Sequence, residues 1–112
     1  MSARSTVRWT RTAVDDLLGV VDYVVGRDGT ATAQQLAELV TGEVATLATM
    51  SLRCRVVSEL EAEGIDGYRE LLVGPYRIMF ALRDSDVIVL AVLDGRRDLA
   101  ELLIARALRD RG

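Results

Sequence analysis

Three β-prone segments, separated by two very short turns, follow one another between residues 68 and 93. The segments are residues 68–73 (YRELLV), 76–82 (YRIMFAL) and 87–93 (VIVLAVL), and the turns are residues 74–75 (GP) and 83–86 (RDSD). Connections this short cannot carry the chain back across a sheet, so the segments must pair as an antiparallel meander. Residues 87–93 are almost wholly apolar, which predicts a central strand buried on both faces.

Two amphipathic helices are expected ahead of this meander. Apolar residues recur at helical spacing between Val14 and Val25, and again between Leu36 and Ala48. The candidate N-caps are Thr10 or Thr12 for the first helix and Thr30 or Thr32 for the second. Residues 26–29 (GRDG) end the first helix, and a connection of so few residues predicts an antiparallel hairpin.

The remaining segments complete an α+β fold in a single domain spanning residues 1–112. Residues 5–9 (STVRW) and 55–60 (RVVSEL) are β-prone and predict two further short strands, the first with Trp9 as a core anchor. Asp98 can cap a final helix close to the C-terminus. The expected order is β-α-α-β-β-β-α, in which the α-hairpin packs on one face of a small antiparallel sheet.

The sequence lacks residues on which several kinds of enzyme depend. Its 112 residues include no His, and every one of the 14 basic residues is Arg. A Ser-His-Asp triad, a His-ligated metal and a lysine Schiff base are therefore excluded. The one cysteine, Cys54, cannot form an internal disulfide. We expect a protein that uses no cofactor and no metal.

Charge and hydropathy narrow the choice of partner. The net charge is −3 at pH 7, whereas proteins that bind nucleic acid through its phosphates are usually basic. We therefore expect no sequence-specific contact with nucleic acid. The N-terminus does not resemble a signal peptide, and the longest apolar run, residues 87–93, is too short to span a membrane. These features predict a cytoplasmic protein with no membrane partner.

Three stretches resemble the RelE/ParE superfamily, the toxins of bacterial type II toxin–antitoxin systems. They are residues 7–10 (VRWT), 68–78 (YRELLVGPYRI) and 92–99 (VLDGRRDL). The resemblance covers nearly the whole chain and implies the element order given above. It also implies one of two activities that share this fold. RelE-like members cleave mRNA, usually on the ribosome, and ParE-like members inhibit DNA gyrase.

The resemblance to the ribonuclease branch implies candidate catalytic residues. Arg77 matches the arginine of the Tyr-Arg strand, which would stabilise phosphate. Arg69 and Arg96 fall near basic positions, and Glu59 near a glutamate, that ribonucleases of this fold use. Each residue also has a structural alternative. Arg77 and Glu59 could form ion pairs on the sheet, and the other two could be solvated surface residues.

A ribonuclease built from these residues lacks a good base. Cleavage of RNA without a metal needs a group to take the 2′-OH proton, and Arg stays protonated at neutral pH. With no Lys or His, only carboxylates such as Glu59 and Glu70 are left. We therefore expect the ParE-like activity, in which the protein is not an enzyme and blocks replication by binding gyrase. Arg77, Arg96 and Arg97 are the expected target-binding residues.

The resemblance also implies a protein partner. A toxin of this type pairs with a cognate antitoxin, in a tight complex that we expect to be a heterotetramer or larger. An antitoxin tail would lay a helix in a groove of the toxin and add a strand at the sheet edge. Two alternatives to gyrase inhibition stay open. They are a RelE-like ribosome-dependent endoribonuclease and a degenerate, non-toxic member that still binds the antitoxin.

Overall fold

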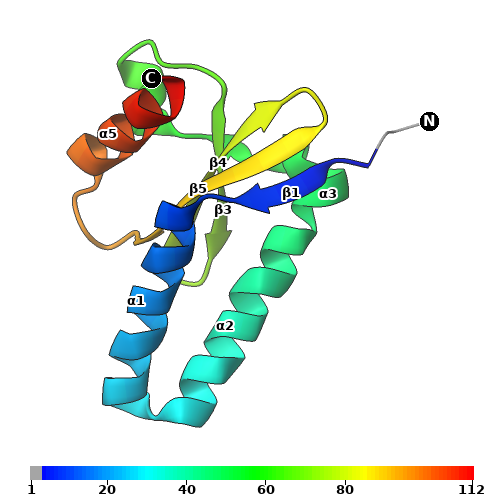
Figure 1. Cartoon of the computed structure of the whole chain (residues 1–112). Coiled ribbons are helices and arrows are strands. Elements are labelled where there is room, and N and C mark those ends of the chain that lie inside the picture. Colours follow the sequence, from blue (N-terminus) through cyan, green and yellow to red (C-terminus); the bar gives the residue numbers. More distant parts are fainter. Residues whose placement is uncertain (1–3) are drawn as a thin grey trace.

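The computed structural model describes residues 4–112. They form a five-stranded sheet in the order β1-β5-β4-β3-β2, with helices on both faces (Figure 1). The strands are β1 (Thr6–Trp9), β2 (Arg55–Val56), β3 (Tyr68–Val73), β4 (Tyr76–Arg83) and β5 (Asp86–Asp94). All neighbouring strands are antiparallel except β1, which pairs with β5 in parallel. The α+β class and the antiparallel meander are confirmed.

The predicted α-hairpin covers one face of the sheet. It consists of α1 (Arg11–Asp28) and α2 (Thr30–Ala45), and the connecting Gly29 has a φ of 94°, a backbone conformation that favours glycine. Thr10 caps α1, because its hydroxyl oxygen accepts a hydrogen bond from the Ala13 backbone N–H at 3.1 Å. Short turns, α3 (Leu47–Met50) and η1 (Ser51–Arg53), lead from the hairpin to β2.

Helices α4 (Ser58–Ala62) and α5 (Ala100–Arg111) cover the opposite face. The sheet therefore separates two apolar cores. The core on the hairpin side includes Ala13, Val40, Val44, Leu47, Ile78, Phe80 and Val89, with the partly buried Trp9 packed against it. The core on the α5 side includes Val57, Leu60, Met79, Ala91, Leu103 and Ala107. Within residues 4–112, no helix has the length and apolar character that crossing a bilayer requires.

Strand β5 is buried on both faces, as predicted, but β4 takes the central position in the sheet. The pairing of β4 with β5 passes from Phe80↔Val89 to Met79↔Ala91, so Leu90 is an extra residue in β5. Because of this bulge, Leu90 and its neighbour Ala91 both contribute to the core on the α5 side. The bulge thus shifts the alternation of side chains by one residue, so each later residue of β5 faces the side of the sheet opposite to the one that unbroken alternation would give.

The strand predicted over residues 55–60 is wrong in its second half. Strand β2 ends at Val56, and the chain enters α4 at Ser58. Val57 and Leu60 are each 1% exposed in the same core. Residues three apart lie on one side of a helix but on opposite faces of a strand, so burying both favours the helix.

The predicted cap of the last helix is nearly right. Leu99 occupies the N-cap position of α5, one residue after Asp98. The Asp98 carboxylate still accepts a hydrogen bond from the Ala100 backbone N–H at 3.3 Å. Asp98 therefore satisfies one of the open N–H groups at the start of α5.

Candidate functional site

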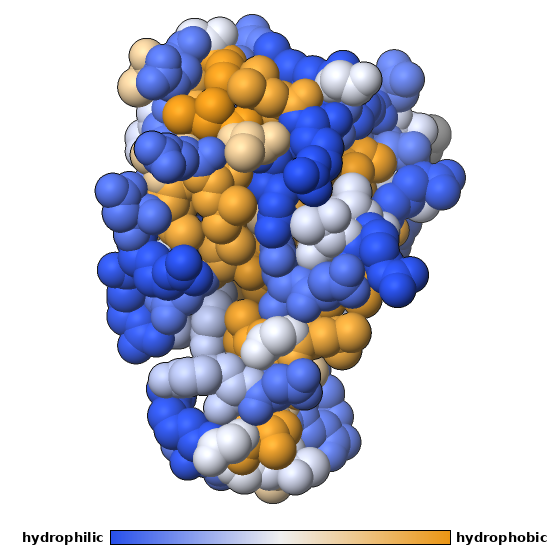
Figure 2. Space-filling model, turned by 60° about the vertical axis from the view of Figure 1, so that its left-hand side comes forward, coloured by the Kyte–Doolittle hydropathy of each residue, from blue (hydrophilic) through white to orange (hydrophobic). Residues whose placement is uncertain are grey.

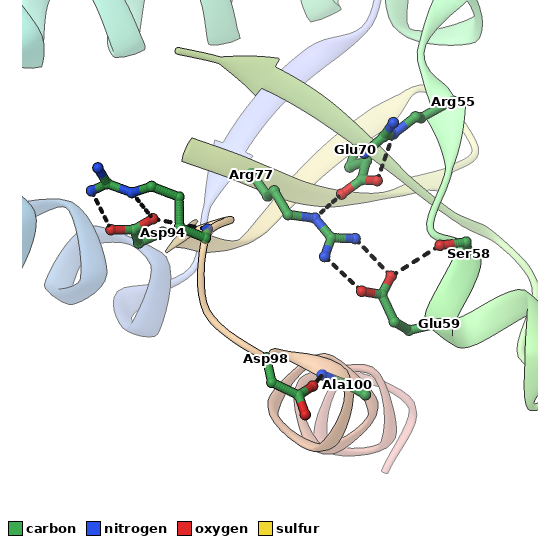
Figure 3. A network of polar contacts seen from close by, with 9 residues as sticks. Arg55, Ser58, Glu59, Glu70, Arg77, Asp94, Asp98 and Ala100 are labelled. Atoms are coloured by element: carbon green, nitrogen blue, oxygen red, sulfur yellow. Dashed lines mark hydrogen bonds and ion pairs between the residues drawn. The ribbon is translucent and has the colours of Figure 1, made fainter. Parts of the chain in front are cut away.

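Four charged side chains from four elements meet on the α5 side of the sheet (Figure 3). The Glu70 carboxylate accepts hydrogen bonds from Nε of Arg77 at 2.6 Å and from Nε of Arg55 at 2.7 Å. The two terminal nitrogens of Arg77 donate to the two oxygens of Glu59, at 2.6 and 2.7 Å. We term Arg55, Glu59, Glu70 and Arg77 the ion-pair network.

The sheet register brings these residues together. Arg55 of β2 lies directly opposite Glu70 of β3, and Arg77 of β4 lies opposite Leu72. Glu70 and Leu72 are two apart along β3, so they share a face, and Arg77 shares it with them. Glu59 reaches the same place because α4 begins soon after β2 ends. The network thus depends on strand pairing and on the short helix α4.

The charges of the network are largely shielded from water and compensate one another. The Glu70 side chain is 1% exposed and that of Arg77 is 13% exposed. Hydrogen bonds from Arg77 lower the pKa of Glu59 to about 2, although burial opposes this shift. The bond to Glu59 is in turn the largest cause that raises the pKa of Arg77 above its ordinary value. A buried carboxylate such as Glu70 is stable only when it is paired in this way.

This arrangement suits structure better than catalysis. A general base works best with a pKa near the working pH, and a carboxylate with a pKa of about 2 is a weak base. Nε and both terminal nitrogens of Arg77 already donate to carboxylates, so its guanidinium is not presented to a phosphate. Glu59 and Arg77 therefore form an ion pair with each other. An ion pair was the structural alternative to a catalytic role that the sequence allowed for both residues.

The other predicted residues lie outside the network. Arg69 pairs with Phe80, whose side chain faces the hairpin, and its guanidinium donates to the Cys54 carbonyl at 2.6 Å. Arg96 binds the Asp94 carboxylate through Nε at 3.0 Å and through a terminal nitrogen at 2.7 Å. These bonds are the largest cause of a pKa of about 2 for Asp94.

Arg55 is the member of the network that the sequence did not reveal. It precedes Glu70 by fifteen positions in the sequence, and α4 lies between the two residues. No spacing rule connects residues across such a segment, so the pairing follows only from the register of β2 with β3. The one signal in the sequence was a basic residue at the start of a predicted strand.

A groove of about 420 Å³ lies between α1 and the C-terminal end of β5, on the hairpin side of the sheet. Its lining includes Val20 and Tyr23 of α1, Tyr76 at the start of β4, Val92 of β5, and Arg97. Figure 2 brings forward the side of the molecule on which α1 and α5 lie, and shows hydrophobic residues there bordered by hydrophilic ones. The groove is therefore an amphipathic surface with two tyrosines.

Arg97 is the uncompensated charge of this groove. Three acidic residues also line it, and each has an arginine partner: Asp15 with Arg11 at 3.4 Å, Asp16 with Arg106 at 2.8 Å, and Asp94 with Arg96 at 2.7 Å. Arg97 is exposed, and no carboxylate among residues 4–112 forms an ion pair with it. We term the surface lined by Asp15, Asp16, Tyr23, Tyr76, Asp94 and Arg97 the Arg97 groove.

Comparisons with known proteins agree with this fold. The sequence profile described as ParE toxin of type II toxin-antitoxin system, parDE, matches residues 7–99. A solved structure titled Chromosomal ParDE TA system from P. aeruginosa is similar with a TM-score of 0.68 and 20% identity, covering 81% of this chain and 96% of that chain. No curated protein sequence matches significantly. Because the profile spans most of its length, the chain belongs to the ParE toxin family of type II toxin–antitoxin systems.

Proposed function

We propose that this toxin inhibits DNA gyrase by binding it and thereby blocks replication, and that a cognate antitoxin neutralises it. The ion-pair network is the observation that carries the proposal. Glu59 and Arg77, which a ribonuclease of this fold would use, are bound to each other, and the pKa of Glu59 is about 2. A toxin whose candidate base and candidate phosphate ligand are both occupied in this way acts through its surface.

The Arg97 groove is the target-binding surface that we propose. Arg97 offers a guanidinium without an ion pair among residues 4–112, and Tyr23 is 63% exposed beside it. Arginine and tyrosine are enriched among the residues that dominate binding energy at protein interfaces. The groove therefore offers an apolar floor for a partner side chain and a cation for a partner carboxylate.

Arg77 and Arg96 act as positioning residues in this proposal. The Gly95 backbone N–H donates to the Pro75 carbonyl at 2.7 Å, which ties the turn after β5 to the turn before β4. The stem of Arg77 packs against the same turn, because a Cβ on Gly95 would lie 2.9 Å from Cγ of Arg77. Arg96 closes the turn through Asp94. Together they fix the backbone that presents Arg97.

The test uses purified toxin, gyrase, ATP and relaxed plasmid DNA. Supercoiling should be lost, and linear DNA should accumulate, at toxin concentrations near that of gyrase. Arg97→Glu should raise the toxin concentration needed by at least about tenfold, the effect of losing a central interface contact. Arg53→Glu is the matched control, because Arg53 is also exposed and also has no ion pair among residues 4–112.

Three other outcomes would contradict the proposal. Unaffected gyrase with mRNA cleaved in a translation extract would establish the ribonuclease activity, especially if Glu59→Gln abolished the cleavage while the protein stayed folded. A protein that inhibits neither process but binds its antitoxin would be a degenerate member of the family. Equal potency of Arg97→Glu and the wild type would place the gyrase contact elsewhere.

A gyrase target implies that the toxin acts in the cytoplasm.

A further inference from the structure

The outer face of α5 carries side chains that the fold leaves uncovered. Helix α5 lies at the periphery of the molecule, and its Leu103 and Ala107 pack into the core (Figure 1). Helical spacing places four exposed residues together on the opposite side of the helix: Glu101, Ala105, Leu108 and Arg109. We term these four residues the α5 face. Leu108 is 55% exposed, so the α5 face has an apolar side chain that no part of the fold covers.

The two charges of the α5 face are uncompensated. Neither Glu101 nor Arg109 forms an ion pair among residues 4–112, whereas the other two arginines of α5 are held by carboxylates. Glu101 lies four positions before Ala105, and Arg109 lies four positions after it. The α5 face therefore has an acid and a base at equal distances from a small central residue, and this pattern is complementary to itself when reversed.

We propose that two copies of this chain pair through the α5 face, with antiparallel helices and a two-fold axis at Ala105. In this register, each residue lies opposite the residue of the second copy that is equally far from Ala105 in the other direction. Glu101 of each copy then meets Arg109 of the other, and Leu108 of each meets the half-buried Leu102 of the other. The small side chain of Ala105 allows the helix axes to approach closely.

Other arrangements of the same helices lose the charge complementarity. A parallel pair related by a two-fold axis would bring Glu101 against Glu101 and Arg109 against Arg109, and like charges at an interface are costly. A two-fold axis at a residue other than Ala105 would move Glu101 away from Arg109. The antiparallel register at Ala105 is therefore the one that satisfies both charges.

The dimer should be weak and should leave the target-binding surface open. Helix α5 has twelve residues, so a single pair of such helices buries less area than stable dimers do. We therefore expect a dimer that dissociates on dilution. The Arg97 groove is lined by no residue of the α5 face, so each dimer would present two such grooves. The inference goes beyond the proposed function and does not depend on gyrase.

The test is sedimentation velocity of the purified full-length toxin over a range of concentrations, which measures the Kd of the dimer. Glu101→Arg and Arg109→Glu should each raise the Kd at least about tenfold, because every dimer then contains two pairs of like charges. Both substitutions in one chain restore opposite charges and should recover most of the affinity. An equimolar mixture of the two single variants should also dimerise, since each supplies the charge that the other lacks.

Leu108→Gln tests the apolar part of the interface and should also raise the Kd at least about tenfold. Leu52→Gln and Glu63→Arg are the matched controls, because both residues are exposed and lie outside α5, and they should leave the Kd unchanged. Thermal unfolding at a concentration below the Kd establishes that each variant keeps its fold.

Several results would overturn the inference. One is a wild-type toxin that remains monomeric at millimolar concentration. Another is a Kd that stays the same in both single charge variants, or a double variant that dimerises no better than they do. A monomeric toxin whose Leu108→Gln variant loses affinity for the antitoxin would assign the α5 face to the antitoxin instead. None of these results depends on whether the toxin inhibits gyrase.

Discussion

The Asp16 carboxylate and the Arg106 guanidinium, 90 residues apart in sequence, form a two-point ion pair with distances of 2.8 and 2.9 Å. The pair closes the edge of β5 beyond the end of β1. Asp16 accepts a hydrogen bond from the Val92 N–H at 3.1 Å, and Arg106 donates to the Leu90 carbonyl at 2.9 Å. It thereby ties α1 on one face of the sheet to α5 on the other.

Removing Arg106 should therefore loosen α5. Arg106→Ala should lower the free energy of unfolding by about 3 kcal/mol, because it leaves Asp16 and the Leu90 carbonyl without their partner. Urea unfolding of the purified protein measures the loss. Arg109→Ala, on the same helix and without an ion pair among residues 4–112, should change stability by less than about 0.5 kcal/mol. Equal losses in the two variants would show that the ion pair contributes nothing specific.

The ion-pair network should respond to removal of its central cation. Arg77→Met leaves Glu70, which is 1% exposed, with Arg55 as its one remaining partner in the network. We expect a loss of about 3–5 kcal/mol in the free energy of unfolding. The double variant Arg77→Met with Glu70→Met should recover much of the loss, since no buried carboxylate then lacks its charge partner. A double variant less stable than Arg77→Met would contradict this account.

Stability should fall in acid through Glu59. Its pKa is about 2 in the folded protein and near its ordinary value of about 4.5 when the chain unfolds. The unfolded state therefore binds more protons between these values, so stability is full above about pH 5 and declines towards pH 2. Glu59→Gln should be less stable at pH 7 and lose less stability on acidification. Parallel stability profiles for the two proteins would exclude Glu59 as a source.

Two glycines should respond to alanine in opposite directions. At Gly95 a Cβ would lie 2.9 Å from Cγ of Arg77 and 3.0 Å from the Pro75 carbonyl oxygen, so Gly95→Ala should cost about 1–3 kcal/mol. At Gly19, inside α1, a Cβ would meet nothing within 4 Å. Gly19→Ala should stabilise the protein by about 0.5–1 kcal/mol, because alanine favours the helix. Thermal unfolding of both variants checks the signs.

Local patterns were sufficient for most of the fold. Short turns defined the meander, the helical spacing of apolar residues defined the hairpin, and Asp98 indicated where α5 begins. Residues 57–60 were mistaken for strand because Val56 and Val57 are both β-branched, and only the burial of Leu60 decides for a helix. The parallel pairing of β1 with β5 depends on how distant segments pack, which no local pattern encodes.

The candidate site was predictable in part. The family resemblance and the charges of Glu59 and Arg77 drew attention to the right pair, and the ion pair was one of the two expected roles. Arg55 was not predictable, because it pairs with Glu70 only through the register of β2 with β3. The different roles of Arg96 and Arg97 were not predictable either. The two arginines are adjacent in the sequence, and the structure shows that Asp94 forms an ion pair with Arg96 and not with Arg97.

The pairing of β1 with β5 determines when the toxin can fold during its synthesis. Residues 6–9 pair with residues 86–89, so β1 cannot join the sheet until β5 is present (Figure 1). Contacts so distant in sequence slow folding, because a long loop must close before they form. A nascent chain that stops short of residue 86 has a hairpin but no completed sheet to support it. The toxin fold can therefore be completed only after β5 has been synthesised.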